Sequence, residues 1–150
     1  MHGTRLENLS GVTMTDDEID ALLRAEGVGV LSMAEDGNAY GIPMSFGYDG
    51  ENRLFMVFVE SDVENRKDQF VASTGSASFL VYRAEAPHDW ESVVVEGEIR
   101  RARPEEKDDA VDALQDNAWH PDLFSGSNPL RGFETYVVDA TAKAGRRAEG

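Results

Sequence analysis

The sequence predicts a mainly β domain of the α+β class, a small antiparallel β-barrel of about six strands with a few flanking helices. Three observations support this prediction. Apolar residues recur with a period of two in six segments, and several of these segments are joined by turns too short for the crossover that parallel strands need. The helical segments are also too few for a doubly wound sheet, which leaves a barrel of antiparallel strands.

The composition is that of a globular protein, and residues 1–150 are expected to form a single domain. Hydrophobic residues make up 41% of the chain, which is enough for a core. No apolar run is long enough to cross a bilayer, and the first residues lack the apolar core of a signal peptide. We therefore expect a cytoplasmic protein without a membrane partner. The absence of cysteine excludes disulfides and thiolate metal sites.

The chain carries a formal charge of −15, from 29 acidic and 14 basic residues. The carboxylates are spread along the whole chain. This favours a surface adapted to high salt, and hence a halophilic source, over a site for a basic partner. No basic stripe is present that could neutralise phosphates, so nucleic acid is not an expected partner.

Helix and strand signals alternate along the chain. A capping box at residues 15–18 begins the first helix and Gly27 ends it. A second capping box at 61–64 begins a short helix to about residue 72, and Pro104 begins another to about residue 117. Strands are predicted over residues 28–34, 39–48, 53–59, 76–83, 90–102 and 133–141. Loose termini are predicted at residues 1–13 and 143–150.

Three features refine the strands. Pro43 cannot donate to a ladder, so the second strand is expected to form an edge or a bulge at this point. Residues 53–59 are apolar on both faces, which predicts a central strand. Gly97 indicates a bulge or a point of close packing in the fifth strand.

The motifs assign no catalytic residue and no metal ligand. The three histidines are scattered without a metal-ligand spacing. The chain also lacks a nucleophile elbow, a P-loop and a dinucleotide glycine fingerprint. Carboxylates are so numerous that two of them close together indicate a solvated surface rather than an acid–base pair.

The most informative charges are the adjacent cations Arg66 and Lys67, in the short helix predicted after the third strand. An arginine can bind a phosphate bidentately and a lysine adds a point charge. With Ser61 at the start of the helix, these residues could form an anion site. The other interpretation is a solvated helix face on which the two cations pair with neighbouring acids.

Two further segments carry groups suited to a flat heteroaromatic ligand. Residues 40–46 contain a proline, a glycine and few charges. Main-chain groups there can remain free for the edge of a ring, although an ordinary edge strand is the alternative. Residues 90–97 offer the Ser92 hydroxyl and the Trp90 indole, although tryptophan is more often a core or interface anchor.

The order of these motifs resembles the FMN-binding split barrels related to pyridoxamine 5'-phosphate oxidase, and most closely the nitroimidazole-resistance-like branch. The similar motifs are Gly29 to Ser32, Asp36 to Pro43, Arg66-Lys67 and Ser92 to Gly97. They lie within a stretch from about Thr15 to Gly97. Each motif is short, so the specificity of the resemblance comes from their order.

The resemblance implies a homodimer with FMN in each of two clefts between the subunits. The implied cofactor-binding residues are Pro43, Met44, Ser45 and Phe46 along the isoalloxazine, Phe58 and Val59 near the ribityl chain, Ser61, Arg66 and Lys67 at the phosphate, and Ser92 and Val93 on the fifth strand. A flavin would carry the redox chemistry. The resemblance therefore predicts a flavin-dependent oxidoreductase acting on a small molecule that the sequence does not identify.

Departures from the family pattern narrow the expected activity. The chain lacks the oxidase's Arg and Lys in the second-strand region and its C-terminal Arg–His pair, so activity on pyridoxamine phosphate is not predicted. The nitroimidazole-resistance pattern has a histidine at the end of the third strand, where this chain has Val57 and Phe58. Nitroreduction is therefore not predicted either.

Two other functions stay open from the sequence. A deazaflavin-dependent redox enzyme would need a larger basic groove for the longer acidic tail of that cofactor, which favours FMN. No residue excludes a non-catalytic module that binds a flavin or haem. The loop at residues 119–124 can cover the cofactor through Trp119 or His120, or it can anchor the fold through Trp119, Leu123 and Phe124.

Overall fold

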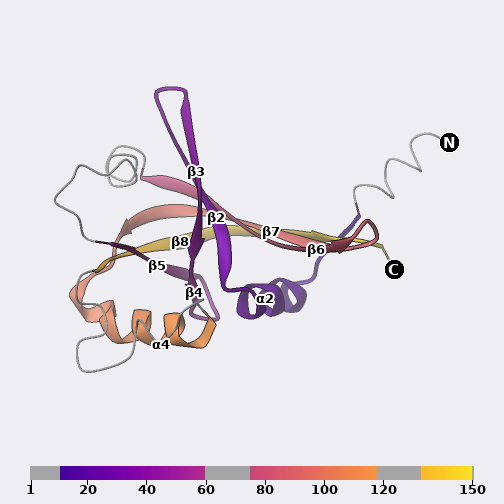
Figure 1. Cartoon of the computed structure of the whole chain (residues 1–150). Helices are drawn as coiled ribbons and strands as arrows, with labels where there is room; N and C mark the ends of the chain where they lie inside the picture. The colour runs from indigo at the N-terminus through magenta and orange to yellow at the C-terminus, as the bar shows by residue number, and fades with distance from the viewer. Residues whose placement is uncertain (1–10, 60–74, 118–132, 150) are drawn as a thin grey trace.

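The chain forms one curled antiparallel sheet with two α-helices against it (Figure 1). The computed structural model describes residues 11–59, 75–117 and 133–149. The strands are β1 (Val12–Thr13), β2 (Val28–Glu35), β3 (Asn38–Ser45), β4 (Gly47–Tyr48), β5 (Arg53–Val59), β6 (Ser76–Ala86), β7 (Asp89–Arg101) and β8 (Phe133–Arg147). The helices are α2 (Asp16–Ala25), the 3₁₀ turn η1 (Pro104–Glu106) and α4 (Lys107–Asn117).

The order of the strands explains why the sheet curls. It runs β3-β2-β6-β7-β8-β5-β4, with β1 paired to β8. Only Phe46 separates the two end strands β3 and β4 in the chain, and its N–H donates to the carbonyl of Gly27 at 3.1 Å. This arrangement confirms the predicted mainly β split barrel. The described residues form eight strands rather than about six, because Phe46 divides the predicted segment 39–48 and the short β1 joins β8.

The interior of the barrel is filled by apolar side chains of the strands and of α2. Thr15 caps α2 as predicted, since its hydroxyl accepts from the Glu18 N–H at 3.2 Å and its own N–H donates to the Glu18 carboxylate at 2.9 Å. The buried face of α2 consists of Ile19, Leu22 and Leu23. Phe46 and Phe79 belong to the same core cluster, with ring centroids 5.1 Å apart in an edge-to-face arrangement.

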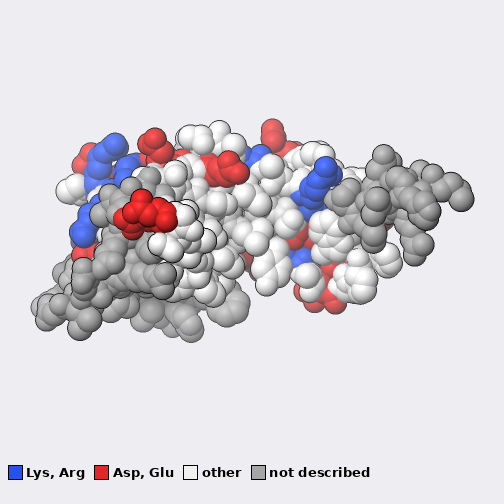
Figure 2. Space-filling model, turned by 90° about the horizontal axis from the view of Figure 1, so that it is seen from above, with Lys and Arg blue, Asp and Glu red and all other residues white. Residues whose placement is uncertain are grey.

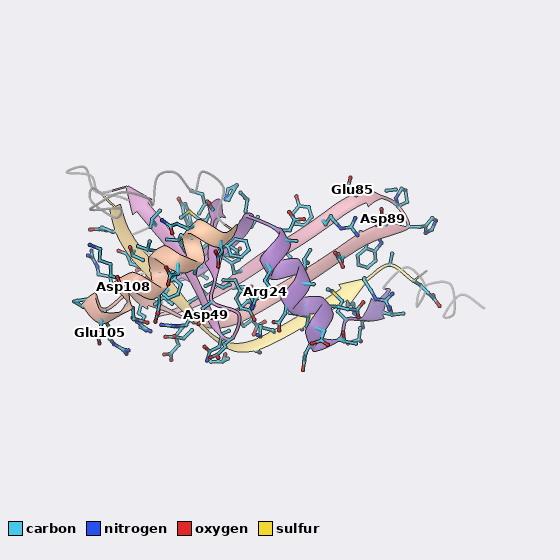
Figure 3. The ribbon with its side chains drawn as sticks, turned by 90° about the horizontal axis from the view of Figure 1, so that it is seen from below. Arg24, Asp49, Glu85, Asp89, Glu105 and Asp108 are labelled. Carbon is cyan, nitrogen blue, oxygen red and sulfur yellow. The ribbon has the colours of Figure 1, made fainter. Side chains whose placement is uncertain are left out.

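Helix α4 covers the outer face of the sheet at β4, β5 and β8. A second buried cluster joins the helix to these strands and consists of Phe55, Ala110, Ala113, Leu114 and Val137. Gly47 permits this contact, because a Cβ at that position would overlap the backbone of Ala113. Figure 3 shows α4 and α2 on the same side of the molecule.

The position of β5 corrects one prediction. The middle of segment 53–59 is buried on both faces, as its composition indicates, because Leu54 and Met56 belong to the barrel core and Phe55 to the cluster beneath α4. The segment does not form a central strand, because β5 lies next to the end strand β4. Helix α4, rather than a central place in the sheet, accounts for the burial of its second face.

The predictions made for Pro43 and Gly97 are both confirmed. Pro43 lies on the edge strand β3. Gly97 lies at a register shift between β7 and β8, and a Cβ there would overlap the backbone of Asp139. Gly97 therefore marks both a bulge and a point of close packing.

The predicted loose termini are wrong near both ends of the described chain. Strand β8 continues past Lys143 to Arg147, because it pairs with β7 along this length. The same end of β8 pairs with Val12 and Thr13. The helix predicted over 61–72 and the loop over 119–132 lie outside the described residues. Within the described ranges, no helix is long and apolar enough to cross a membrane.

Candidate functional site

The outer face of the sheet carries a row of apolar side chains that no described segment covers. Register aligns Pro43, Val30, Leu80, Val94 and Ala144 directly across β3, β2, β6, β7 and β8. We call this set the apolar row. Its side chains are partly or fully exposed, and Tyr82, the next outward residue on β6, is 55% exposed. Figure 2 shows a broad uncharged area in the middle of this face. An exposed apolar strip of this kind indicates a binding surface.

A cavity of about 630 Å³ lies beside the apolar row. It follows the next row of the register, in which Ser32, Ser78 and Glu96 lie directly opposite one another. The polar residues of its lining are Ser32, Ser76, Ser78, Glu96, Glu98 and Thr141. Small side chains and hydroxyls thus leave room for a ligand, whereas the two carboxylates make this cavity unfavourable for an anionic group.

A second cavity, of about 320 Å³, lies on the other side of the row, towards the β6–β7 hairpin. Its lining consists of Trp90, Ser92, Val94, Ala144, Gly145 and Arg146. The described lining contains one charged group, Arg146, and no carboxylate. The two cavities on this face therefore have opposite electrostatic character.

Charged side chains elsewhere are paired around the start of α4. Glu106 is 6% exposed and accepts hydrogen bonds from Arg100 at 2.7 and 3.1 Å and from Arg53 at 3.2 Å. Arg100 also donates to Asp139 at 2.6 Å. Hydrogen bonds, first of all those from Arg100, lower the pKa of Glu106 to about 2. This cluster ties η1 and α4 to β5, β7 and β8.

A third cavity, of about 310 Å³, has residues of α2, the β4–β5 turn and α4 in its lining. Tyr48 donates to Asp20 at 2.6 Å and accepts from Lys143 at 3.0 Å. Burial, and then the bond to Asp20, raises the pKa of the Tyr48 hydroxyl well above its ordinary value. Arg24 and Asp49, which also line the cavity, are labelled in Figure 3.

Asp49 belongs to the same set of contacts. Burial acts to raise its pKa, but hydrogen bonds from the backbone and side chain of Arg53 outweigh burial, so the pKa of Asp49 is lowered. Tyr48 and Asp49 are therefore both engaged by neighbouring groups. We therefore infer that the contacts around this third cavity have a structural role, which is to hold α2 and the β4–β5 turn in place.

The structure divides the predicted flavin contacts of β3 between two faces. Pro43 is exposed on the outer face, and Ser45, two residues further on, is partly exposed. Met44 is 7% exposed and Phe46 is fully buried, so both side chains belong to the core. These two residues can offer a ligand only main-chain groups, which is the mode of contact that the resemblance implies.

The predicted contacts of β7 are divided in the same way. Ser92 lines the second cavity, whereas the side chain of Val93 is fully buried. Three strand intervals separate Pro43 on β3 from β7, which is about 14 Å along the sheet. Pro43 and Ser92 of one copy therefore lie on one face without meeting.

Five other predicted residues cannot be placed as side chains. Phe58 and Val59 pair through their backbones with Glu134 and Phe133 of β8, and their side chains lie outside the described part of the structure. The predicted phosphate-binding residues Ser61, Arg66 and Lys67 lie outside the described residues altogether. The phosphate site stays a prediction.

Arg146 and the hydroxyl groups of the larger cavity were not among the predicted site residues. Arg146 falls in the segment predicted to be a loose tail. The period of two places Ser32 and Ser78 outward, between core residues of their strands. The apolar row also had a signal, because residues 79–81 and 93–95 are apolar on both faces.

Solved structures share this fold. A FAD-binding protein from Mesorhizobium loti has a TM-score of 0.72 and 22% identity, over 92% of this chain and 98% of its own. A candidate 5-nitroimidazole antibiotic resistance protein from Bacteroides thetaiotaomicron has a TM-score of 0.71 and 20% identity, over 89% of this chain and 85% of its own. The FAD and heme binding protein from Mycobacterium smegmatis has a TM-score of 0.70 and 15% identity, over 91% and 72%.

Sequence identities this low show a shared fold but do not assign the chain to a family, whereas a match to a family model does. A search of curated protein sequences found no match to this chain. The model described as pyridoxamine 5'-phosphate oxidase matches residues 15–147. That range contains every strand from β2 to β8, both helices, the apolar row and both outer cavities. The chain therefore belongs to the pyridoxamine 5'-phosphate oxidase family.

Proposed function

We propose that the protein is a homodimeric flavoprotein that binds FMN at the uncovered outer face and uses it in the oxidoreduction of a small molecule. The observation that carries the proposal is the apolar row beside the cavity of about 630 Å³. Ligand sites of small molecules commonly have volumes of about 300–1,000 Å³ and apolar walls with few polar groups. Family membership and the FAD-binding protein of the same fold support a flavin as the occupant.

The residues present suit the ring end of a flavin better than its phosphate end. Gly41, Ser32 and Ser78 are small, so a flat ring can approach the backbone there. The two serines also supply hydroxyl groups. Glu96 and Glu98 disfavour a phosphate in the same cavity. The phosphate would therefore extend to the predicted cations outside the described residues.

A bound flavin would itself supply the redox chemistry. The chain then has to bind the ring, orient it and exclude water. Strand β3 is the end strand of the described sheet and pairs there with β2, so main-chain groups along its outer edge could hydrogen-bond the ring edge. The apolar row would exclude water from one side.

The separation of Pro43 and Ser92 supports a dimer. A flavin ring system that contacts Pro43 does not span three strand intervals to reach Ser92 of the same copy. If two apolar rows pack together about a two-fold axis parallel to the strands, the β7 end of one copy faces the β3 end of the other. Each site then combines Pro43 of one copy with Ser92 of the other.

The first test identifies the cofactor. The purified protein should be yellow with a flavin absorption spectrum, and chromatography of the heat-released compound should give FMN. A colourless protein that also fails to bind added FMN would overturn the proposal. Release of FAD or a deazaflavin would overturn the choice of FMN.

The second test addresses the phosphate. Replacing Arg66 and Lys67 together by alanine should weaken FMN binding by several kcal/mol, since charge-assisted bonds are worth about 1.5–3 kcal/mol each. Riboflavin, which has no phosphate, should bind the variant and the parent equally. Equal weakening of both compounds would show that these residues do not hold the phosphate.

The third test addresses the dimer. Leu80→Glu places a charge in the centre of the apolar row and should convert the dimer to a monomer in light scattering after size exclusion. Ala86→Glu adds the same charge to an exposed position at the end of β6 and should remain dimeric. A Leu80→Glu variant that stays dimeric would show that the apolar row is not the interface.

Haem binding is the second candidate, because the FAD and heme binding protein from Mycobacterium smegmatis has this fold. Haem iron commonly needs a histidine or cysteine ligand. The chain has no cysteine, and the histidine in the described part, His88, is exposed at the β6–β7 turn and lines neither outer cavity. A Soret band in the absorption spectrum would favour haem over FMN.

A further inference from the structure

The larger outer cavity is acidic along its β7 wall. Ser32 of β2 and Ser78 of β6 lie in register, and Glu96 of β7 lies opposite Ser78 in the same row. Glu98, the next outward residue of β7, pairs with Ser76. Both glutamates line the cavity, and both are exposed. Hydroxyl groups therefore lie in the middle of this space and two carboxylates lie at one side of it.

The charged groups near these two carboxylates do not neutralise them. Arg100, the next outward residue of β7, binds Glu106 at 2.7 Å and Asp139 at 2.6 Å. Lys143 of β8 donates to the Tyr48 hydroxyl at 3.0 Å on the inner face of the sheet. Strands β2, β3 and β6 contribute only uncharged residues to the lining. A ring bound in this cavity would therefore meet two carboxylates that no described cation neutralises.

Glu96 is close enough to this row to act on a bound ring. It lies one strand interval from Ser78 and two from Ser32, which are about 5 and 10 Å. A ring and a second copy packed on this face would exclude water and so lower the effective dielectric constant. At an effective dielectric constant of about 20, a full charge about 10 Å away changes an ionisation equilibrium more than tenfold. In the proposed dimer, Glu96 of the second copy would also approach the Gly41 end of the row.

We propose that Glu96 controls the protonation of the reduced flavin and lowers its reduction potential, with a smaller contribution from Glu98. Two electrons and two protons convert the oxidised ring to a neutral reduced ring, whereas two electrons and one proton leave it with one negative charge. The carboxylates disfavour the charged form, so the reduced ring keeps its second proton to a higher pH. Where only one proton is taken up, the same repulsion lowers the potential. This inference rests on the proposed flavin site.

Redox titration of the full-length, FMN-loaded protein over a range of pH tests the inference, with dithionite as the electron donor and reference dyes to report the potential. The slope of the potential against pH gives the number of protons taken up with two electrons. The change from two protons to one should occur about one pH unit or more lower in Glu96→Gln than in the parent. Above that change the variant should have the higher potential, by about 30 mV or more, which is a tenfold shift of a two-electron couple. Below it the two potentials should be equal.

Two further variants separate a local effect from the effect of total charge. Glu98→Gln, one row further from the ring, should shift the potential in the same direction by a smaller amount. Glu85→Gln removes an exposed acid near the hairpin, labelled in Figure 3. It lies seven residues from Ser78 on β6, about 23 Å along the strand, and its removal should leave the potential unchanged. Equal shifts in Glu96→Gln and Glu85→Gln would overturn the role of Glu96.

The absorption spectrum of the fully reduced protein gives a second readout, because the neutral and the charged reduced rings absorb differently. The parent should keep the spectrum of the neutral ring to a higher pH than Glu96→Gln. A flavin-loaded Glu96→Gln variant that matches the parent in potential, slope and spectrum would overturn this inference and leave the cofactor assignment intact. A protein that binds no flavin would overturn both.

Discussion

The two halves of the outer sheet face have similar strands but different surroundings. Where β4, β5 and β8 meet α4, Phe55 and Val137 are fully buried beneath Leu114. On β2, β6 and β7, aliphatic residues of the apolar row occupy equivalent outward positions, and neither of the described α-helices lies above them. Ion pairs surround the covered half, whereas uncharged atoms dominate the other (Figure 2).

This difference teaches that outward apolar residues have two separate roles in this chain. In the covered half they add to the core and stabilise the single chain. In the uncovered half they leave apolar area exposed, which a folded monomer gains nothing by keeping. Binding of a second copy and a ligand, as proposed above, would account for their presence there.

The largest expected effect is a difference in stability between two matched leucine variants, one in the covered half and one in the uncovered half. Leu114→Ala, in the covered half, should lower the free energy of unfolding by about 2–5 kcal/mol because it leaves a cavity in a filled cluster. Leu80→Ala, in the apolar row, should cost less than about 1 kcal/mol in the single chain and weaken the proposed dimer instead. Urea denaturation at two protein concentrations measures both effects. Similar losses for the two variants in monomeric protein would remove the distinction between the halves.

The ion pairs of the covered half give the next effect. Glu106→Gln should cost about 1.5–3 kcal/mol, because Arg100 and Arg53 lose charge-assisted hydrogen bonds to a buried carboxylate. Asp108→Asn, at an exposed acid in the first turn of the adjoining helix α4 that is labelled in Figure 3, should cost less than about 1 kcal/mol. Chemical denaturation of the three proteins at neutral pH gives these values.

The pKa of Glu106 adds a pH dependence to this prediction. Its folded-state pKa of about 2 lies below the ordinary value of 4.5. The carboxylate therefore contributes its full stabilisation above about pH 5 and loses it as the pH falls towards 2. The stability difference between the parent and Glu106→Gln should narrow over this range. A difference that stays constant from pH 7 to pH 3 would contradict the assignment.

Alanine substitutions at two glycines, one in each half, test the same comparison with a smaller expected change in stability. Gly47→Ala should destabilise the protein by about 1–3 kcal/mol, because its Cβ would collide with the backbone of Ala113 in α4. Gly41→Ala, at the edge of the uncovered half, places its Cβ 3.5 Å from the Ser32 hydroxyl, an ordinary contact. Its thermal midpoint should match the parent or exceed it slightly. Equal destabilisation by both changes would mean that the close approach of α4 is unimportant.

The smallest expected effect on the single chain is that of Tyr82→Ala. The side chain is 55% exposed, so its removal should change the unfolding free energy of the monomer by less than about 0.5 kcal/mol. The proposed dimer should dissociate at a higher protein concentration in this variant than in the parent, because an exposed aromatic beside the apolar row can serve as an interface anchor. Sedimentation equilibrium measures the change, and an unaltered dissociation constant would exclude Tyr82 from the interface.

Local signals predicted much of the fold. The capping box at Thr15, the edge position of Pro43 and the bulge at Gly97 all depend on a few neighbouring residues, and all three are confirmed. The extension of β8 was missed because residues 140–145 are mostly alanine, glycine and lysine, which have weak strand preference. Pairing with β7 on one side and β1 on the other orders this segment despite its composition.

The candidate site was less predictable than the fold. Ser92 was identified from a local motif, but its neighbour Arg146 lies 54 positions further along the chain. Register between β7 and β8 brings the two together, and no short-range pattern contains that information. The same holds for the larger cavity, whose lining combines residues 32, 78 and 96.

The sequence by itself determined that this protein is mainly β and antiparallel, that it is strongly acidic, that it has no cysteine chemistry and that its motifs follow the order of a flavin-binding family. These properties depend on composition and on patterns within one element. Only the tertiary structure decided which outward apolar residues lie under α4 and which form the uncovered row. The physical reason is that coverage depends on contacts between distant segments, such as the seat that Gly47 leaves for Ala113, and a pattern of period two looks the same in either case.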